Sequence, residues 1–154
     1  MIPSKSHVQV LLWLARQYPI RTVLELGPGD ISTPVFLREF PHLTRLVSLE
    51  DNVEYAVGLV YEDPRWELKI VPSVSEAVAV CDLDYDLILV DNDTTVSGRV
   101  QTIRTLADRV PRGFVVIHDF ERVEYREASV PFPHRLVIDT EPQHVAVLGY
   151  RPVP

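Results

Sequence analysis

The chain has 154 residues, of which 46% are apolar and 24% are charged, a balance typical of one globular domain with a buried core. Its formal net charge of -7 argues against general binding to nucleic-acid phosphates, which needs a basic face. The single cysteine, Cys81, allows neither an internal disulfide bond nor a cysteine-rich zinc site. We therefore expect one domain over residues 1–154, without a nucleic-acid partner.

No apolar run approaches the ~18 residues of a membrane span. Residues 8–15 are apolar, but Gln9 interrupts them and no small-residue cleavage site follows, so we interpret them as part of a helix. These features predict a cytoplasmic protein that does not contact a membrane.

Strand and helix signals alternate along the chain. Apolar residues at helical spacing predict a first helix over residues 4–18. Apolar or alternating runs then predict strands at 22–26, 46–50, 66–71, 86–91, 114–118, 136–139 and 145–148. Capping residues and helical spacing predict the helices between them, near 34–40, 53–60, 74–80 and 96–110, with one or two turns within 121–128.

Two helix starts have specific signals. Thr33 and Pro34 suit the N-cap and the first position of the second helix. Ser73 and Glu76 form a capping box. The alternation of apolar strands with helices predicts an α/β fold with a mostly parallel sheet covered on both faces. The last two strands are too close together for a helical crossover, so we expect them to form an antiparallel hairpin.

The first predicted strand runs into the glycine turn Gly27–Gly29, and the second ends in Glu50. This pattern favours a nucleotide-shaped ligand, with its ribose on the distant carboxylate and close backbone approach at the glycines. Glu25, just before the turn, favours a ligand with an amino group over one with a pyrophosphate. The alternatives are a tight turn that binds nothing and, for Glu25, a cap for the following helix.

The chain resembles the class I S-adenosylmethionine-dependent methyltransferases over nearly its whole length. Four segments carry the resemblance in the right order: residues 25–29 (ELGPG), 48–51 (SLED), 85–91 (YDLILVD) and 111–119 (PRGFVVIHD). Their spacing is similar to that of small-molecule and sugar O-methyltransferases. The resemblance implies a Rossmann-like methyltransferase sandwich with a seven-stranded sheet. Ile31 departs from it, because the family often has a third glycine at this position.

The resemblance also implies a set of contacts to S-adenosylmethionine. Gly27 and Gly29 would line its methionine and ribose part, with Pro28 fixing the loop. Glu25 would hold its ammonium group directly or through water, and Glu50 would accept from both ribose hydroxyls. Further contacts would come from Asp51, Ser73 and Asp91, although Asp51 is better suited to capping a helix and Ser73 is equally suited to that role.

The acceptor would bind at the same sheet edge, where Asp91 and the pair His118-Asp119 end two strands. We expect Asp91 or His118 to be the general base and Asp119 to be a third catalytic residue. The alternatives are a solvated capping loop, which is most plausible for Asp93, and a structural strand-end histidine. Arg99 is a candidate anion contact, and the polar segment 122–126 either covers the substrate or forms a solvated turn.

Cation-dependent O-methyltransferases have aspartates where Asp91 and Asp119 stand, but an asparagine where Phe120 stands. Asp93 or His118 would have to complete the shell of a hard cation. We therefore predict no metal and keep a divalent cation as the less favoured alternative.

Our leading hypothesis is methyl transfer from S-adenosylmethionine to a small molecule or sugar, mainly on oxygen. Two alternatives stay open: a non-catalytic binding or scaffold module that kept the fold, and a nicotinamide-dependent oxidoreductase that uses Glu50. The segment between the fifth and sixth strands is short, so we also keep open a homodimer in which a partner subunit completes the site.

Overall fold

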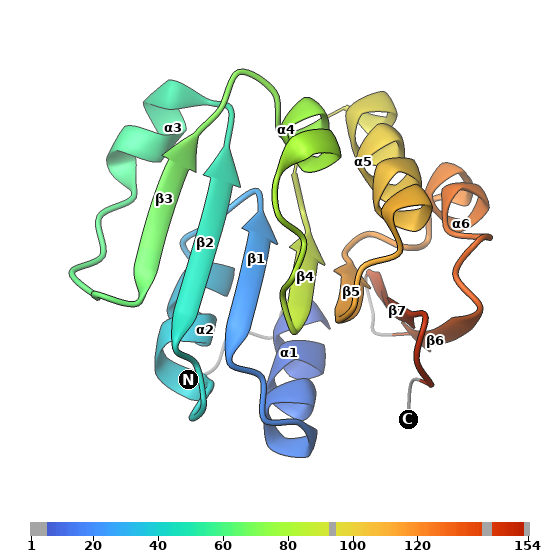
Figure 1. Cartoon of the computed structure of the whole chain (residues 1–154), viewed down its shortest axis with the longest axis horizontal. Helices are drawn as coiled ribbons and strands as arrows, with labels where there is room; N and C mark the ends of the chain where they lie inside the picture. The colour runs from blue at the N-terminus through green and yellow to red at the C-terminus, as the bar shows by residue number, and fades with distance from the viewer. Residues whose placement is uncertain (1–5, 93–94, 140–142, 153–154) are drawn as a thin grey trace.

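The computed structural model describes residues 6–92, 95–139 and 143–152. Its strands form one seven-stranded sheet in the order β3-β2-β1-β4-β5-β7-β6 (Figure 1). In chain order they are β1 (Thr22–Leu26), β2 (Arg45–Glu50), β3 (Trp66–Ile70), β4 (Leu87–Val90), β5 (Phe114–Ile117), β6 (His134–Asp139) and β7 (His144–Gly149). The helices are α1 (Ser6–Gln17), α2 (Ser32–Glu39), α3 (Val53–Gly58), α4 (Val74–Val80), α5 (Val96–Arg109) and α6 (Val123–Ala128).

The topology confirms the predicted mostly parallel, Rossmann-like sheet. Strands β1 to β5 pair in parallel, whereas β7 pairs antiparallel with both β5 and β6. Each parallel pair is reached through a helical crossover, and only the last connection is short enough for a hairpin. Residues 4 and 5 of the predicted first helix, Asp93, and residues 141–142 of the predicted hairpin turn lie outside the described residues.

Two apolar cores cover the two faces of the sheet. One packs α1 and α2 against Val23, Leu46 and other strand residues, and the second packs α4, α5 and α6 against the opposite face, which includes Leu24 and Leu26. Successive side chains of a strand point to opposite faces. Glu25 therefore points into the face covered by α1 and α2.

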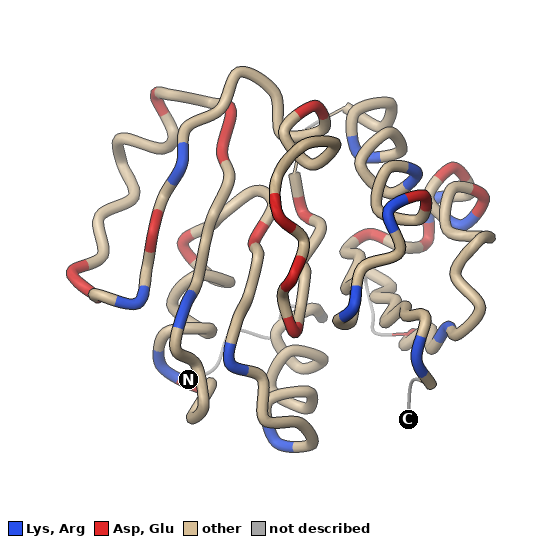
Figure 2. Tube along the Cα trace, viewed as in Figure 1, with Lys and Arg blue, Asp and Glu red and all other residues tan. Residues whose placement is uncertain are grey.

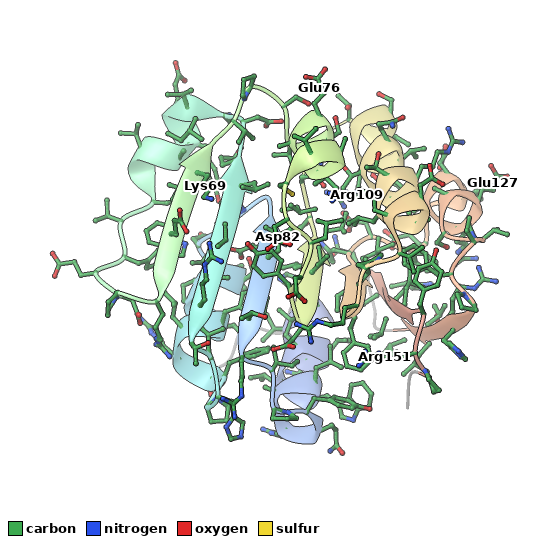
Figure 3. All side chains as sticks on the ribbon, viewed as in Figure 1. Lys69, Glu76, Asp82, Arg109, Glu127 and Arg151 are labelled. Carbon is green, nitrogen blue, oxygen red and sulfur yellow. The ribbon has the colours of Figure 1, made fainter. Side chains whose placement is uncertain are left out.

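The side chain of Arg109 fastens α5 to its neighbour α4. Arg109 at the end of α5 lies beside α4 (Figure 3). Its Nη1 donates to the carbonyl oxygens of Val78, at 2.7 Å, and of Cys81, at 2.6 Å. This arginine therefore satisfies two carbonyls that the end of α4 leaves open.

Two helices differ from the sequence prediction. Helix α2 begins at Ser32 rather than Pro34, and its N-cap position is Ile31, which makes no side-chain cap. Thr33, predicted as that N-cap, instead donates to Glu25. Helix α3 ends at Gly58 and buries only Ala56, so its valines do not face the core as their spacing predicted. The reason is that β3, beside it, is an edge strand with largely exposed side chains.

Charges of both signs are distributed along the part of the chain that the structure describes. Lys and Arg positions are scattered among Asp and Glu positions along the trace (Figure 2). Among the described residues, no helix is both long and apolar enough to cross a bilayer.

Candidate functional site

A cavity of about 1020 Å³ opens at the carboxyl ends of the parallel strands, where ligands of α/β sheets bind. One part, here called the turn half, is lined by residues 27–32, 50–52 and Tyr55. The other, here called the cluster half, is lined by His7, Asp91, Val96, Arg99, His118, Asp119, Arg122, Tyr125 and Gln143. Small-molecule sites typically measure about 300–1000 Å³, so this cavity has room for two ligands side by side.

The two glycines of the turn, Gly27 and Gly29, lie in different structural environments. Gly27 has a φ of +83°, and a Cβ on it would lie 2.5 Å from the carbonyl oxygen of Asp91. Gly27 is therefore required by its backbone conformation and by close packing against the end of β4. A Cβ on Gly29 would come no closer than 3.7 Å to Ser32 Oγ and the Tyr55 hydroxyl. A Cβ on Gly29 would therefore fit in ordinary van der Waals contact, and Gly29 lines the cavity.

Glu25 lies beneath the site. Its side chain is fully buried and is not part of the cavity lining. The carboxylate accepts hydrogen bonds from Ser32 Oγ at 2.6 Å, Thr33 Oγ1 at 2.8 Å and Ser48 Oγ at 2.6 Å. Burial raises its pKa to about 7, although the three hydroxyl groups oppose the shift. These donors are side-chain hydroxyl groups rather than backbone amides, so Glu25 anchors the start of α2 without capping it, and its contact with a ligand's ammonium group stays a prediction.

Glu50, the predicted ribose contact, lines the turn half. Its Oε1 accepts from the backbone amides of Asp51, at 2.9 Å, and Asn52, at 2.8 Å. No donor among the described residues reaches Oε2, so this oxygen is available to a ligand. Burial raises the pKa of Glu50, while the two amides lower it.

Of the other residues predicted to contact the cofactor in this half, some line the cavity and one caps a helix instead. Asp51 and Pro28 line the cavity. Asp51 Oδ2 also accepts from the amide of Val74 at 3.1 Å, which ties the end of β2 to the start of α4. Asn52, not Asp51, caps α3, and Ser73 caps α4 by accepting from Glu76. Ser73 is not part of the cavity lining.

The cluster half contains a charged network centred on Arg99. This side chain is buried, and its Nη2 lies 3.3 Å from Asp91 Oδ1 while its Nη1 lies 3.1 Å from Asp119 Oδ2. Its Nε donates to the carbonyl oxygen of Asn92 at 2.9 Å, and its guanidinium lies over the ring of Tyr125. Arg99 therefore joins α5 to the ends of β4 and β5.

His118 completes the network, and both of its ring nitrogens are engaged. Nδ1 lies 3.1 Å from Asp91 Oδ1, and Nε2 lies 3.0 Å from Gln143 Oε1. Burial opposes protonation of the ring, but the hydrogen bond and charge of Asp91, with Asp119 and Gln143, outweigh it and raise the pKa of His118. Both ring nitrogens thus have a partner, and a substrate would have to displace Gln143 from Nε2 to reach the ring.

The residues considered as metal ligands lie close together, but the positively charged side chain of Arg99 already contacts two of them. Ligand atoms of Asp91, His118 and Asp119 all lie within 4.8 Å of one another. Arg99 bridges both carboxylates of this group. Its guanidinium would repel a divalent ion, so the donor set does not fit a resident metal.

Several lining residues were not singled out from the sequence. His7 packs edge-on against His118 with ring centroids 4.4 Å apart, although the two are far apart in the chain. Gln143 and Tyr55 have no local motif, and only the fold brings them to the cavity. Arg99 and the segment 122–126 were noted as candidates, and the structure places Arg99, Arg122 and Tyr125 at the site.

Comparison with solved structures identifies the fold. Rv0187 from MTB, solved with its cofactor bound, superposes with a TM-score of 0.68 at 21% identity, covering 96% of this chain and 80% of that one. The N-methyltransferase NodS from Bradyrhizobium japonicum WM9 gives 0.59 at 13% identity, covering 92% and 91%. This is the class I methyltransferase fold. No protein-family model and no curated protein sequence matches the chain.

Spermidine synthases share this fold as well. The enzyme from Thermotoga maritima gives a TM-score of 0.62 at 20% identity and covers 92% of this chain. The chain spans 59% and 56% of the lengths of the two spermidine synthases that it matches. The named activities of these neighbours differ, so the shared fold leaves the acceptor open.

Proposed function

We propose that this protein is an S-adenosylmethionine-dependent methyltransferase that methylates a small molecule, on oxygen. The observation that carries the proposal is the turn half of the cavity. There, Glu50 offers a carboxylate oxygen without a partner among the described residues, in the part of the cavity that Gly29 also lines. This arrangement fits a ribose diol and the chain attached to it.

The residues of the chain would act mainly by binding and orientation. When bound, S-adenosylmethionine supplies an electrophilic methyl group, so the protein has to align the acceptor with it. Glu50 would hold the ribose, and Gly27, Pro28 and Gly29 would shape the floor. Asp91, His118 and Asp119 would orient the acceptor as one hydrogen-bonded unit, in place of the single general base expected from the sequence.

Calorimetric titration with S-adenosylhomocysteine tests this function. We expect the wild-type protein to bind it and Glu50→Gln to bind at least about tenfold more weakly, because a carboxylate hydrogen bond contributes about 1.5–3 kcal/mol. Glu39→Gln, which changes an exposed glutamate of α2, should bind like wild type. Binding of NADH in place of S-adenosylhomocysteine would favour the oxidoreductase alternative, and binding of neither would favour the scaffold alternative.

The cytoplasmic location and the homodimer remain predictions. The homodimer can be checked by light scattering.

A further inference from the structure

We propose that the acceptor is a small carboxylate, anchored by Arg122 and methylated on one of its carboxylate oxygens. This inference rests on the methyl transfer proposed above and names its substrate class.

The first observation is that the three residues expected to act on the acceptor, Asp91, His118 and Asp119, are joined with Arg99 in one network. Asp91 Oδ1 faces both Arg99 Nη2, at 3.3 Å, and His118 Nδ1, at 3.1 Å. Asp119 Oδ2 faces Arg99 Nη1 at 3.1 Å. The second nitrogen of His118 faces Gln143. His118 could accept a proton from a hydroxyl group only by giving up one of its two contacts, and a carboxylate of this network that accepted one would lose the charge that pairs it with Arg99.

The second observation is the position of Arg122. It lines the cluster half of the cavity and is exposed there. Its backbone is held in place, since its amide donates to the carbonyl oxygen of Asp119 at 3.2 Å. The guanidinium forms no ion pair with any residue that the structure describes, whereas Arg99 in the same half bridges two carboxylates. Arg122 therefore offers its charge and its planar set of donors to a ligand, a geometry that suits a carboxylate.

These two observations discriminate between acceptor classes. An alcohol or phenol would need a base, because both are protonated at neutral pH. An amine would arrive as an ammonium ion, which needs a base and is repelled by Arg122. A carboxylate, with a pKa of about 4, is already ionised and is attracted by the arginine.

The reaction then balances without a proton. A lone pair of the carboxylate oxygen forms a bond to the methyl carbon, and the bond between that carbon and sulfur breaks with its electrons remaining on sulfur. The products are a neutral methyl ester and S-adenosylhomocysteine. No group of the chain has to change its protonation state during this step.

The test measures binding of carboxylates and of their uncharged amides to the protein saturated with S-adenosylhomocysteine. A calorimetric panel of acetate, succinate, benzoate and phenylacetate is paired with the corresponding amides. We expect at least one acid to bind tenfold or more tightly than its amide. The preference should disappear in Arg122→Gln and persist in Arg104→Gln, which removes an exposed arginine of α5 outside the cavity lining. Circular dichroism checks that both variants fold.

A second readout follows the methyl group itself. With methyl-labelled S-adenosylmethionine and the bound acid, the label should be released as methanol by mild alkali, because esters hydrolyse while methyl ethers and methylamines do not. Equal binding of acids and amides, no binding of any acid, an unchanged preference in Arg122→Gln, or an alkali-stable product would each overturn the inference. Failure of the wild type to bind S-adenosylhomocysteine would instead count against the proposed function.

Discussion

At the scale of single residues, the glycine turn shows that adjacent members of one motif serve different purposes. Gly27 meets the backbone at the end of β4, whereas Gly29 borders the cavity. From the sequence, both glycines were predicted to allow close approach of a ligand. The residue type alone does not tell whether a glycine avoids a clash with the protein or with a ligand. Only the packing of β1 against β4 separates the two cases.

The two glycines should therefore respond differently to the same substitution. We expect Gly27→Ala to lower the free energy of unfolding by about 2–4 kcal/mol, because it combines a positive φ with a backbone clash. Gly29→Ala should change that free energy by less than about 1 kcal/mol. Gly29→Ala should nevertheless weaken the binding of S-adenosylhomocysteine, because the added methyl group enters the cavity. Urea unfolding and calorimetry check both expectations, and wild-type affinity in Gly29→Ala would contradict the role of this residue.

Glu25 makes stability depend on pH. Its pKa is about 7 in the folded protein, against an ordinary value of 4.5. Between these values the folded state holds a proton that the unfolded state has lost, so the free energy of unfolding falls as the pH rises from about 4.5 to about 7. The shift corresponds to a loss of about 3 kcal/mol.

Glu25→Gln should remove this loss, because glutamine does not titrate. The measurement is the urea midpoint of both proteins between pH 5 and pH 8, and the difference between them isolates Glu25 from His118. Since Glu25 lies outside the cavity lining, Glu25→Gln should keep its affinity for S-adenosylhomocysteine. Equal pH slopes in the two proteins would show that Glu25 titrates normally.

At the scale of elements, the N-cap residue predicted from the sequence is correct for α4 and wrong for α2. Ser73 caps α4 as its capping box predicted. At α2 the predicted cap Thr33 instead turns to Glu25, because a fully buried carboxylate needs donors more than the helix start needs an acceptor. A hydrogen bond of this kind, between side chains of different elements, leaves no local pattern in the sequence.

Ser73→Ala separates capping from cofactor contact. Loss of the cap should lower the free energy of unfolding by about 1 kcal/mol. The affinity for S-adenosylhomocysteine should stay unchanged, because Ser73 does not line the cavity. Ser97→Ala, at an exposed position of the first turn of α5, is the matched control. A large loss of affinity in Ser73→Ala alone would restore the predicted adenine contact.

At the scale of the whole molecule, the order and type of the elements could be predicted, but the inner arrangement of the site could not. Apolar strands, intervening helices and a short last connection are local signals that determine the sheet. Local signals could not predict the network of Asp91, Arg99 and His118, because it joins a residue of α5 to the residues that follow β4 and β5. The sequence indicated these residues as candidates for the site, but it did not indicate that they pair with one another.

The formal net charge of -7 has a kinetic consequence. S-adenosylmethionine carries one net positive charge, whereas S-adenosylhomocysteine carries none, so the field of the protein should speed the encounter with the first ligand only. Added salt shortens the distance over which this field acts, to about 10 Å at 0.1 M. In stopped-flow experiments, the association rate of S-adenosylmethionine should fall as salt is added, while that of S-adenosylhomocysteine stays nearly constant. A negatively charged acceptor should show the opposite trend, arriving faster at higher ionic strength.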